Sequence, residues 1–223
     1  MRKIAKVICL VLSFLILQEA MPVINVLAAG EPAFEKRLEW SVDASCNGET
    51  GGTVEVLNCP KNASIVNLKN SNVKVVKVKK GKLDGVPCIT FFPLKAGTSK
   101  VTFTLKWGKN TKKFSCTFVG YKYISPVQEF YVGAKQYAPQ LEKYQNVGVK
   151  LKSNKSIKNQ RVKIKLKNGW VMRSLGGDYN YGEKFFQIKN NTKITVKPGT
   201  SIDLYAYNKK LKREASISVS FYR

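Results

Sequence analysis

The chain has 223 residues and carries 39 Lys or Arg against 14 Asp or Glu, with no histidine, so its formal net charge is +25. The lack of histidine excludes the Ser-His-Asp and Cys-His arrangements of nucleophilic catalysis, and a zinc site would depend on widely spaced cysteines. No phosphate-binding glycine loop or EF-hand loop occurs either, so we expect no catalytic residue, no metal and no cofactor. Such a positive charge indicates an anionic partner, such as a cell-wall polymer, an acidic glycan or membrane headgroups, or only a well-solvated surface.

Residues 1–29 have the pattern of a secretory signal peptide. A basic start precedes the apolar run Val7–Leu17, and Ala28 and Ala29 supply small residues for cleavage. Pro22 follows the apolar run too soon for a comfortable membrane span. We therefore expect a secreted, extracellular protein that has no integral membrane segment after signal cleavage and does not bind nucleic acid. The C-terminal residues carry no sorting motif, so we expect any attachment to the cell surface to be non-covalent.

Alternating hydrophobic residues predict short strands through the first half of the chain. Residues 30–44 are expected to form a polar lead-in that ends in a first strand. Further strands are expected over residues 53–59, 65–68, 73–78 and 89–91. The hydrophobic phase changes between Val75 and Val76, which predicts a bulge or a kink there. Lys80–Pro87 is expected to be a loop.

The clearest pattern is a hairpin over residues 95–123. Two series of alternating hydrophobic residues flank a short loop at Gly108–Asn110. The first series comprises Val101, Phe103 and Leu105, and the second comprises Phe114, Cys116 and Phe118. A period of two residues is typical of antiparallel strands that have one buried face.

The order of motifs in this region resembles the bacterial Ig-like domain, group 2. The resemblance rests on NSNVKVVKV from Asn70, KAGTSKVTFTL from Lys95 and the closing strand TKKFSCTFVGYKY from Thr111. It covers residues 45–123 and implies a small β-sandwich of the kind found in surface proteins and adhesins. It implies no catalysis and no set of binding residues. The sequence departs from the family pattern because it lacks a Trp-Ser pair before Asn70 and has four extra cysteines.

Those four cysteines are disulfide candidates, because the protein is expected outside the cell. They are Cys46, Cys59, Cys88 and Cys116. Four cysteines allow three pairings, and the sequence does not choose among them. Cys116 shares the inward phase of Phe118, whereas Cys88 is out of phase with Ile89. A bridge between these two cysteines is therefore less favourable than their closeness in sequence suggests, because a disulfide needs facing Cβ vectors.

Residues 124–223 form a second predicted domain, which begins near Pro126. Short alternating segments and frequent turn signals predict a second β-sandwich of roughly seven strands. The helical candidate in this half is Ala134–Tyr144, which Pro139 interrupts. The expected fold is therefore all-β, with two β-sandwich domains, the first of them Ig-like, after an N-terminal signal peptide.

Alternating basic residues in the second domain define a candidate binding surface. They are Lys150, Lys152, Arg161, Lys163, Lys165 and Lys167. If the two strands that carry them are adjacent, the six cations share one sheet face that suits an anionic cell-wall polymer or glycan. The alternative is a solvated face whose lysines discourage pairing between sheet edges.

A second candidate surface is aromatic. Tyr179, Tyr181, Phe185 and Phe186 flank a glycine-rich loop, and Trp170 is near them in sequence. Exposed rings there would stack on sugars, as in a carbohydrate-binding module. We favour the alternative, in which these residues fill the core at the end of the sandwich. Burial of Tyr179, Tyr181 and Trp170 would exclude a sugar platform.

Together these patterns predict a secreted, non-enzymatic binding or adhesion module that is associated with the cell surface. The second domain is the expected contact domain, and an anionic cell-wall polymer on the basic face is the first candidate partner. A carbohydrate-recognition module and a purely structural spacer are the alternatives.

Overall fold

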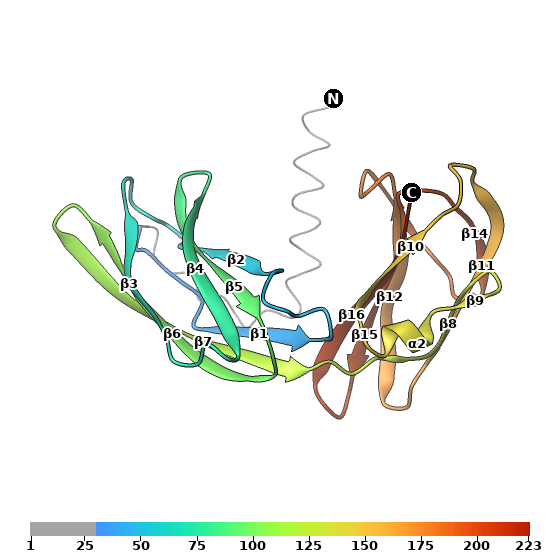
Figure 1. Cartoon of the computed structure of the whole chain (residues 1–223), viewed down its shortest axis with the longest axis horizontal. Coiled ribbons are helices and arrows are strands. Elements are labelled where there is room, and N and C mark those ends of the chain that lie inside the picture. Colours follow the sequence, from blue (N-terminus) through green and yellow to red (C-terminus); the bar gives the residue numbers. More distant parts are fainter. Residues whose placement is uncertain (1–29) are drawn as a thin grey trace.

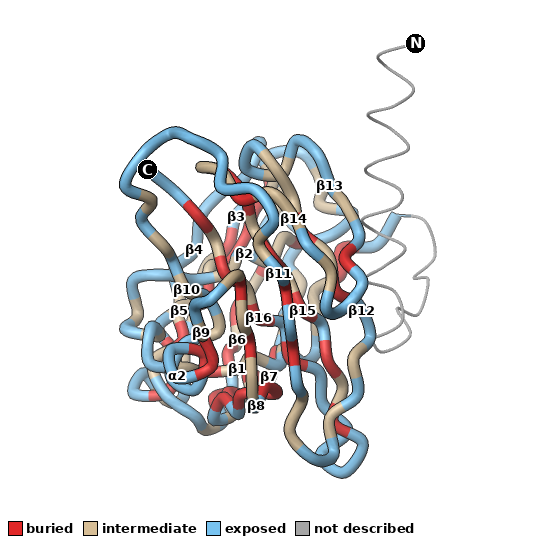
Figure 2. The backbone as a smooth tube through the Cα atoms, turned by 90° about the vertical axis from the view of Figure 1, so that its right-hand side faces the viewer, coloured by how far each residue is buried: buried red, intermediate tan, exposed pale blue. Residues whose placement is uncertain are grey.

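The computed structural model describes residues 30–223, so the predicted signal peptide at residues 1–29 lies outside the described residues. The described chain forms two β-sandwiches that follow one another along the long axis of the molecule (Figure 1). Buried positions lie mainly along the strands and exposed positions along the connecting turns (Figure 2). The prediction of an all-β protein with two sandwich domains is confirmed.

The first sandwich has the strand arrangement of an immunoglobulin domain. Its strands are β1 (Arg37–Val42), β2 (Gly52–Glu55), β3 (Ser64–Asn70), β4 (Val76–Leu83), β5 (Val86–Pro93), β6 (Gly97–Trp107) and β7 (Asn110–Lys122). One sheet has the order β1-β7-β6-β3 and the other the order β2-β5-β4. These match the C-F-G and B-E-D sheets of Ig domains. Strand β1, the first strand expected at the end of residues 30–44, pairs in parallel with β7 and so belongs to this sandwich.

The core of the first sandwich is aromatic, and the predicted hairpin supplies much of it. Phe103 on β6 and Phe118 on β7 are buried, as expected from the alternation, and Phe118 stacks on Phe91 of the opposite sheet with ring centroids 6.1 Å apart. Phe34 packs edge-on against Phe103 at 4.9 Å, which ties the segment before β1 to this core. Burying each ring contributes several kcal/mol, so this contact set fixes how the two sheets face each other.

Two local predictions for the first half are wrong. The expected loop at Lys80–Pro87 is the end of a hairpin, because β4 runs to Leu83 and β5 begins at Val86. Asp84 and Gly85 form its turn with φ of 49° and 82°, the left-handed geometry that an Asp-Gly pair favours in tight hairpins. The expected kink between Val75 and Val76 is a turn before β4, where Val75 N–H donates to the Asn72 carbonyl at 3.1 Å.

Two motifs that carry the Ig-like resemblance contact each other. Asn72 N–H donates to the Ser99 hydroxyl at 3.0 Å, and Lys100 N–H donates to the Ser71 hydroxyl at 2.8 Å. Ser99 also donates a short hydrogen bond to the Asn70 side chain, and Ser99 is buried. The Asn-Ser-Asn turn and the Ala-Gly-Thr turn therefore satisfy each other's polar groups, which gives a physical reason for their joint occurrence.

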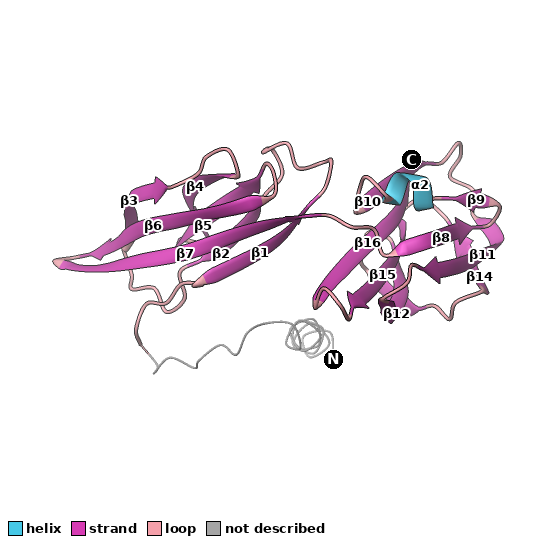
Figure 3. Ribbon diagram, turned by 90° about the horizontal axis from the view of Figure 1, so that it is seen from below, coloured by secondary structure: helices cyan, strands magenta, loops and turns pink. Residues whose placement is uncertain are grey.

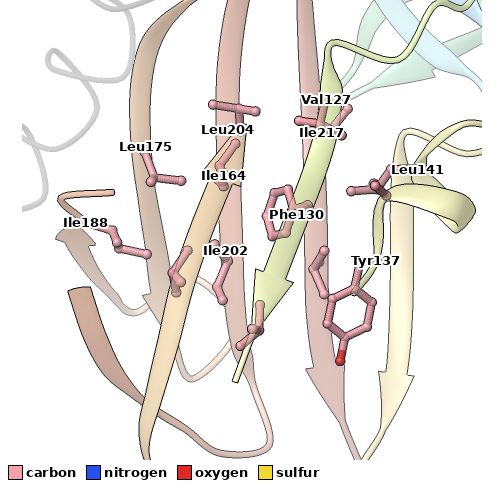
Figure 4. Close-up of a cluster of buried hydrophobic side chains, with 14 of the residues drawn as sticks. Val127, Phe130, Tyr137, Leu141, Ile164, Leu175, Ile188, Ile202, Leu204 and Ile217 are labelled. Carbon is pink, nitrogen blue, oxygen red and sulfur yellow. The ribbon is translucent and has the colours of Figure 1, made fainter. Parts of the chain in front are cut away.

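The second sandwich contains the remaining strands. They are β8 (Val127–Val132), β9 (Lys135–Gln136), β10 (Asn146–Lys150), β11 (Ile157–Leu166), β12 (Trp170–Tyr179), β13 (Lys184–Gln187), β14 (Thr192–Val196), β15 (Thr200–Asn208) and β16 (Arg213–Tyr222). One sheet has the order β10-β16-β15-β12-β13 and the other the order β14-β11-β8-β9. Phe130, Ile202 and Ile217 lie between the sheets in a buried cluster (Figure 4).

A single helical turn, α2 (Ala138–Leu141), closes one end of this core. The candidate helix was expected to be interrupted by Pro139, but Pro139 lies in its first turn, where the missing N–H costs nothing. Leu141 is fully buried and Ala138 nearly so, so α2 packs on the same cluster as Phe130 (Figure 4).

The chain passes from the first sandwich to the second between β7 and β8 (Figure 3). Ala44 N–H donates to the Lys143 carbonyl at 3.0 Å, and Gln145 N–H donates to the Asp43 carboxylate at 2.6 Å. These bonds join the end of β1 to the start of β10, which are far apart in sequence. The junction is therefore held by specific contacts in addition to the linking chain.

Candidate functional site

The second sandwich has a groove of about 380 Å³ on the outer face of the sheet β10-β16-β15-β12-β13. We name it the serine groove. Its floor consists of Asp178, Ser201, Asp203, Ser216, Ser218 and Ser220. Tyr181 and Tyr222 are also among its lining residues. These side chains come from three neighbouring strands and one loop, so the sheet itself positions the groove.

Strict alternation along two strands produces this polar floor. On β15 the outward Ser201 and Asp203 alternate with Ile202 and Leu204, which are fully buried. On β16 the outward serines alternate in the same way with buried Ile217 and Val219. Because successive side chains of a strand point to opposite faces, the residues that build the core also place the polar groups on the opposite surface.

The strand register brings these side chains into rows across the sheet. Ser201 lies between Ser220 on β16 and Asp178 on β12. Asp203 lies beside Ser218 in the next row. Directly opposite residues in an antiparallel sheet have Cβ atoms about 5 Å apart, so hydroxyl and carboxylate groups alternate closely over the floor.

Two carboxylates share one hydroxyl at the centre of the groove. The Ser201 hydroxyl contacts Asp203 Oδ2 at 2.7 Å and makes a shorter hydrogen bond to Asp178 Oδ2. Gly182 N–H donates to Asp178 Oδ1 at 2.8 Å. Neither carboxylate forms a salt bridge within residues 30–223, although basic residues far outnumber acidic ones in this domain. Because a hydroxyl has a single proton, both carboxylates retain acceptor capacity for a ligand.

Aromatic rings border the floor. Tyr222 is 42% exposed, and a Cβ added to Gly148 would lie 3.0 Å from its ring carbon Cε1. The absence of a side chain at Gly148 therefore lets the Tyr222 ring lie over β10. Phe185 on the edge strand β13 pairs with Asp178 and is 76% exposed. Phe185, Tyr181 and Tyr222 together leave three large rings exposed around the polar floor, and such a group of exposed rings marks a candidate contact surface.

Tyr181 is held in a strained backbone conformation at the same end of the groove. Its φ is 57° and that of Asn180 is 56°, in the left-handed region that a bulky residue rarely occupies. Tyr181 N–H donates to the Gly199 carbonyl at 3.1 Å, which holds this conformation, while the side chain stays 77% exposed. Such strain costs about 1–3 kcal/mol and is concentrated at functional sites.

The predicted aromatic group is therefore divided. Tyr179 stacks on Phe186 with ring centroids 4.4 Å apart and donates its hydroxyl to the Thr195 carbonyl at 3.1 Å. Trp170 packs against the core of the second sandwich. Of the five rings, Trp170 and Phe186 are partly buried against the core, and Tyr179 is partly buried on Phe186. The expectation that the whole group fills the core is wrong for Tyr181 and Phe185, which are exposed.

The predicted basic face does not exist as one surface. Strand β10, which ends at Lys150 just before Lys152, pairs with β16, whereas β11 pairs with β8 and β14 in the opposite sheet. The adjacency on which the shared face depended does not occur, because β10 and β11 belong to opposite sheets of the sandwich. Lys167 follows β11 and forms an ion pair with Glu142 at 2.5 Å.

A smaller basic surface remains on the outer face of β11. Arg161, Lys163 and Lys165 point outward there, and Lys193 of β14 lies opposite Arg161. We name these four residues the β11 basic strip. Its charge is partly compensated, because Lys163 pairs with Glu129 at 2.8 Å.

The four cysteines are free thiols, so no disulfide joins them. Cys116 lies inside the first core and Cys88 faces away from Ile89, which confirms the expected opposite orientations. Burial raises the pKa of Cys116 to about 12, so its thiolate is scarce at neutral pH. Burial also raises the pKa of Cys46, Cys59 and Cys88.

Two further properties of residues 30–223 bear on the kind of site. No three His, Cys, Asp or Glu side chains gather there in a way that would hold a metal ion. Over the same range, every helix is too short or too polar to cross a membrane.

The serine groove was not predicted, although its signal is visible in the sequence. The hydrophobic positions of SIDLYAY and ASISVSFY predict inward faces, and the intervening residues are Ser, Asp and Tyr rather than the Lys that dominates other strands. In a strongly basic chain, these two strands are therefore distinguished by outward faces that lack lysine. Their assembly into a groove depends on the register of β12, β15 and β16.

The fold and this site define a protein of two β-sandwich domains, of which the first is Ig-like and the second has a polar groove bordered by aromatic rings. Its sequence matches no protein-family model and no curated protein.

Solved structures of several β-domain proteins do match the chain. The N-terminal four Ig domains of Dscam1 isoform 7.44 are 9% identical with a TM-score of 0.30, covering 85% of this chain and 51% of that one. Fibronectin(III)-like modules of Clostridium thermocellum CbhA are 11% identical with a TM-score of 0.28, covering 91% and 94%. A SusE-like, surface located polysaccharide binding protein of Bacteroides thetaiotaomicron is 8% identical with a TM-score of 0.28, covering 87% and 96%. The Ig-like assignment of the first sandwich rests on its strand order.

Proposed function

We propose that this protein is a secreted, non-enzymatic binding module whose second sandwich holds a carbohydrate in the serine groove. One observation carries the proposal: a floor of hydroxyl and carboxylate groups is bordered by exposed aromatic rings at Tyr181 and Tyr222. A sugar ring has hydroxyls around its edge and an apolar face of C–H groups. It therefore suits a site that offers a few directed polar groups beside aromatic surfaces.

The polar groups of the groove suit sugar hydroxyls in particular. A carboxylate accepts hydrogen bonds from neighbouring hydroxyl donors, and such charge-assisted bonds are about twice as strong as neutral ones. Asp178 and Asp203 are placed for this role by their contacts with Ser201. Serine hydroxyls both donate and accept, so Ser218 and Ser220 can pair with either kind of sugar group.

The test is binding to immobilised polysaccharides. The panel contains neutral glucan, mannan, xylan and N-acetylglucosamine polymers, with hyaluronan and heparin as acidic members. We expect retention on at least one neutral polymer, and Tyr222→Ala should weaken it about three- to tenfold, the range of one aromatic contact. Tyr131→Ala on the opposite sheet is the matched control and should bind as the parent protein does. Retention on no neutral polymer contradicts the proposal.

The same panel tests the proposed absence of catalysis. The chain has no histidine, and we propose that the two groove carboxylates bind hydroxyls rather than cleave glycosidic bonds. Incubation with each bound polysaccharide should release no reducing ends. A steady release that Asp203→Asn abolishes would show an enzyme instead.

A second candidate function is attachment to an anionic cell-wall polymer through the β11 basic strip. The observation that favours it is the clustering of Arg161, Lys163, Lys165 and Lys193 on one outer face. Retention on purified cell wall should then fall steeply with salt, because exposed charges are screened within about 10 Å at 0.1 M. The double variant Lys165→Gln, Lys193→Gln should lose retention. The double variant Lys150→Gln, Lys152→Gln makes the same charge change away from the strip and should keep its retention on the cell wall. Equal retention of the two double variants would contradict a role for the β11 basic strip.

We also propose that the first sandwich is a bacterial Ig-like domain of group 2 that serves as a spacer or adhesive module. The interlocked turns at Asn70–Asn72 and Ser99 support this assignment, because they are the motifs on which the resemblance rests. Export through the signal peptide predicted at residues 1–29 would place the module outside the cell. Secretion of the full chain by an expressing bacterium, with loss of these residues, tests the location.

A further inference from the structure

We propose that the ligand of this sheet is an extended, uncharged polysaccharide chain that lies along β15 and β16 from Tyr222 to Tyr205. The inference rests on the proposed carbohydrate-binding function and deepens it. It names a linear chain contacted over several sugar rings, rather than a terminal sugar held in the serine groove alone.

Tyr205 extends the aromatic surface beyond the groove. It has the same outward phase on β15 as Ser201 and Asp203, and it is 50% exposed. The register places it between Ser174 of β12 and Ser216 of β16, so small polar residues flank the ring on both sides. Small neighbours leave the face of a ring accessible, as stacking on a sugar requires.

The open surface ends at the next outward residue of β15. The guanidinium carbon of Arg173 lies 4.9 Å from the centre of the Tyr207 ring and covers it, and Tyr207 is half-buried. Tyr205 is therefore the last accessible ring on this strand in the direction of the first sandwich. Tyr222 and Tyr181 are the corresponding rings at the far end.

The distance between these rings sets the size of the ligand. Tyr205 is opposite Ser216, and the stretch from Ser216 to Tyr222 at about 3.4 Å per residue spans about 20 Å. That length exceeds a single sugar ring several times over. The floor between the two ends consists of the outward serines of β16 and the polar residues of β15, so a chain would meet hydrogen-bonding groups along its whole length.

Charge decides which kind of chain fits. Asp178 and Asp203 lie in the floor without a salt bridge among residues 30–223, so a polymer of uronic, sulfated or phosphorylated sugars would meet unpaired negative charge at contact distance. Salt screens such close contacts poorly. A neutral chain instead offers hydroxyl donors to both carboxylates. The surrounding excess of lysine therefore does not make this face a polyanion site.

The test uses oligosaccharide ladders from monosaccharide to hexasaccharide, made of β-1,4-linked glucose, mannose or N-acetylglucosamine. Titration calorimetry on a protein of residues 30–223 measures the affinity for each oligosaccharide. We expect affinity to rise through at least the tetrasaccharide of a bound ladder. Tyr205→Ala should lower the affinity for the longest oligomer about three- to tenfold and leave that for the disaccharide unchanged.

Tyr222→Ala should weaken short and long oligomers alike, and Tyr131→Ala on the opposite sheet should weaken neither. Thermal unfolding of each variant checks that the fold is retained. Affinity that reaches its maximum at the disaccharide, or a Tyr205→Ala variant equal to the parent on the hexasaccharide, overturns the extended-chain inference and leaves the groove as a sugar site. Tighter binding of hyaluronan oligomers than of neutral ones also overturns it. Binding to no ladder and to no neutral polymer overturns the proposed function itself.

Discussion

The carboxylate of Asp43 accepts a hydrogen bond of 2.6 Å from the backbone N–H of Gln145, and this bond joins the two sandwiches. The other oxygen of Asp43 accepts from the Ser45 backbone N–H at 2.8 Å and from its hydroxyl at 2.6 Å. Gln145 also donates its side-chain amide to the Ser41 carbonyl at 3.2 Å. Beside this group, Arg213 lies 3.9 Å from the centre of the Tyr121 ring, a cation–π contact between the domains.

Replacing Asp43 with Asn should loosen this junction. The two carboxylate oxygens of Asp43 accept from the backbone N–H groups of Ser45 and Gln145. An amide has only one oxygen, so its NH₂ group would face one of these two N–H donors. We expect a loss of about 1–2 kcal/mol of interdomain stability, near the lower end for charged hydrogen bonds because Asp43 is partly exposed. Small-angle scattering should then show a broader distribution of interdomain distances. Asp84→Asn, the same charge change in a distant turn, should leave the scattering curve unchanged.

The junction should also respond to acid. Burial acts to raise the pKa of Asp43, but hydrogen bonds from Ser45 and Gln145 outweigh it and hold this pKa below its usual value. The separated state therefore takes up a proton at higher pH than the joined state does, so the stabilisation is complete above about pH 4 and decreases as pH falls through the lowered pKa. A scattering series from pH 7 downward should show fixed domains that loosen only below about pH 4. Loosening between pH 5 and pH 7 would contradict this assignment.

Tyr181→Gly should separate stability from binding. Glycine adopts the left-handed φ of 57° without strain, so the substitution removes the backbone strain of the folded state. This gain offsets the loss of stability caused by the greater conformational entropy of glycine in the unfolded chain. We expect an unfolding free energy equal to that of the parent or up to about 1 kcal/mol higher. Retention on neutral polysaccharide should fall, because the exposed ring is lost. A large loss of stability would show that the Tyr181 side chain supports the fold instead.

The four thiols should react with iodoacetamide in an order set by burial. Cys46 and Cys59 are partly exposed, whereas Cys116 is fully buried with a pKa of about 12. Because the thiolate is the reactive form, Cys116 should stay unmodified at pH 8 in the native protein and react as fast as the others in denaturant. Peptide mass spectrometry measures each site. Rapid native labelling of Cys116, or a disulfide between any two of the four, would contradict the structure.

Local patterns in the sequence predict the strands with one buried face. The alternation through Val101, Phe103 and Leu105 correctly identifies the long hairpin, because a period of two residues follows directly from strand geometry. The turn at Asp84 and Gly85 was also predictable, because an Asp-Gly pair favours a tight hairpin turn. The expected loop at Lys80–Pro87 did not use this signal. Both features depend only on residues close together along the chain.

Assignment to a sheet is not local, and the predicted basic face failed on this point. Lys150 and Lys163 lie on strands that follow one another in sequence but belong to opposite sheets. The aromatic group divided for a related reason, since Tyr179 has the inward phase of β12 while Tyr181 lies in a turn held by Gly199. Periodicity shows which residues share a face of one strand, and it cannot show which strands become neighbours.

The sequence by itself determined the all-β class, the two sandwich domains and the inward and outward faces of most strands, because these follow from side-chain alternation. Only the tertiary structure decided that Ser201, Asp178 and Ser220 form one row, and that Asp43 meets Gln145 across the junction. Both depend on long-range pairing between strands. That pairing is selected by the packing of a whole core, in which the lowest free energy belongs to the complete arrangement rather than to any single segment.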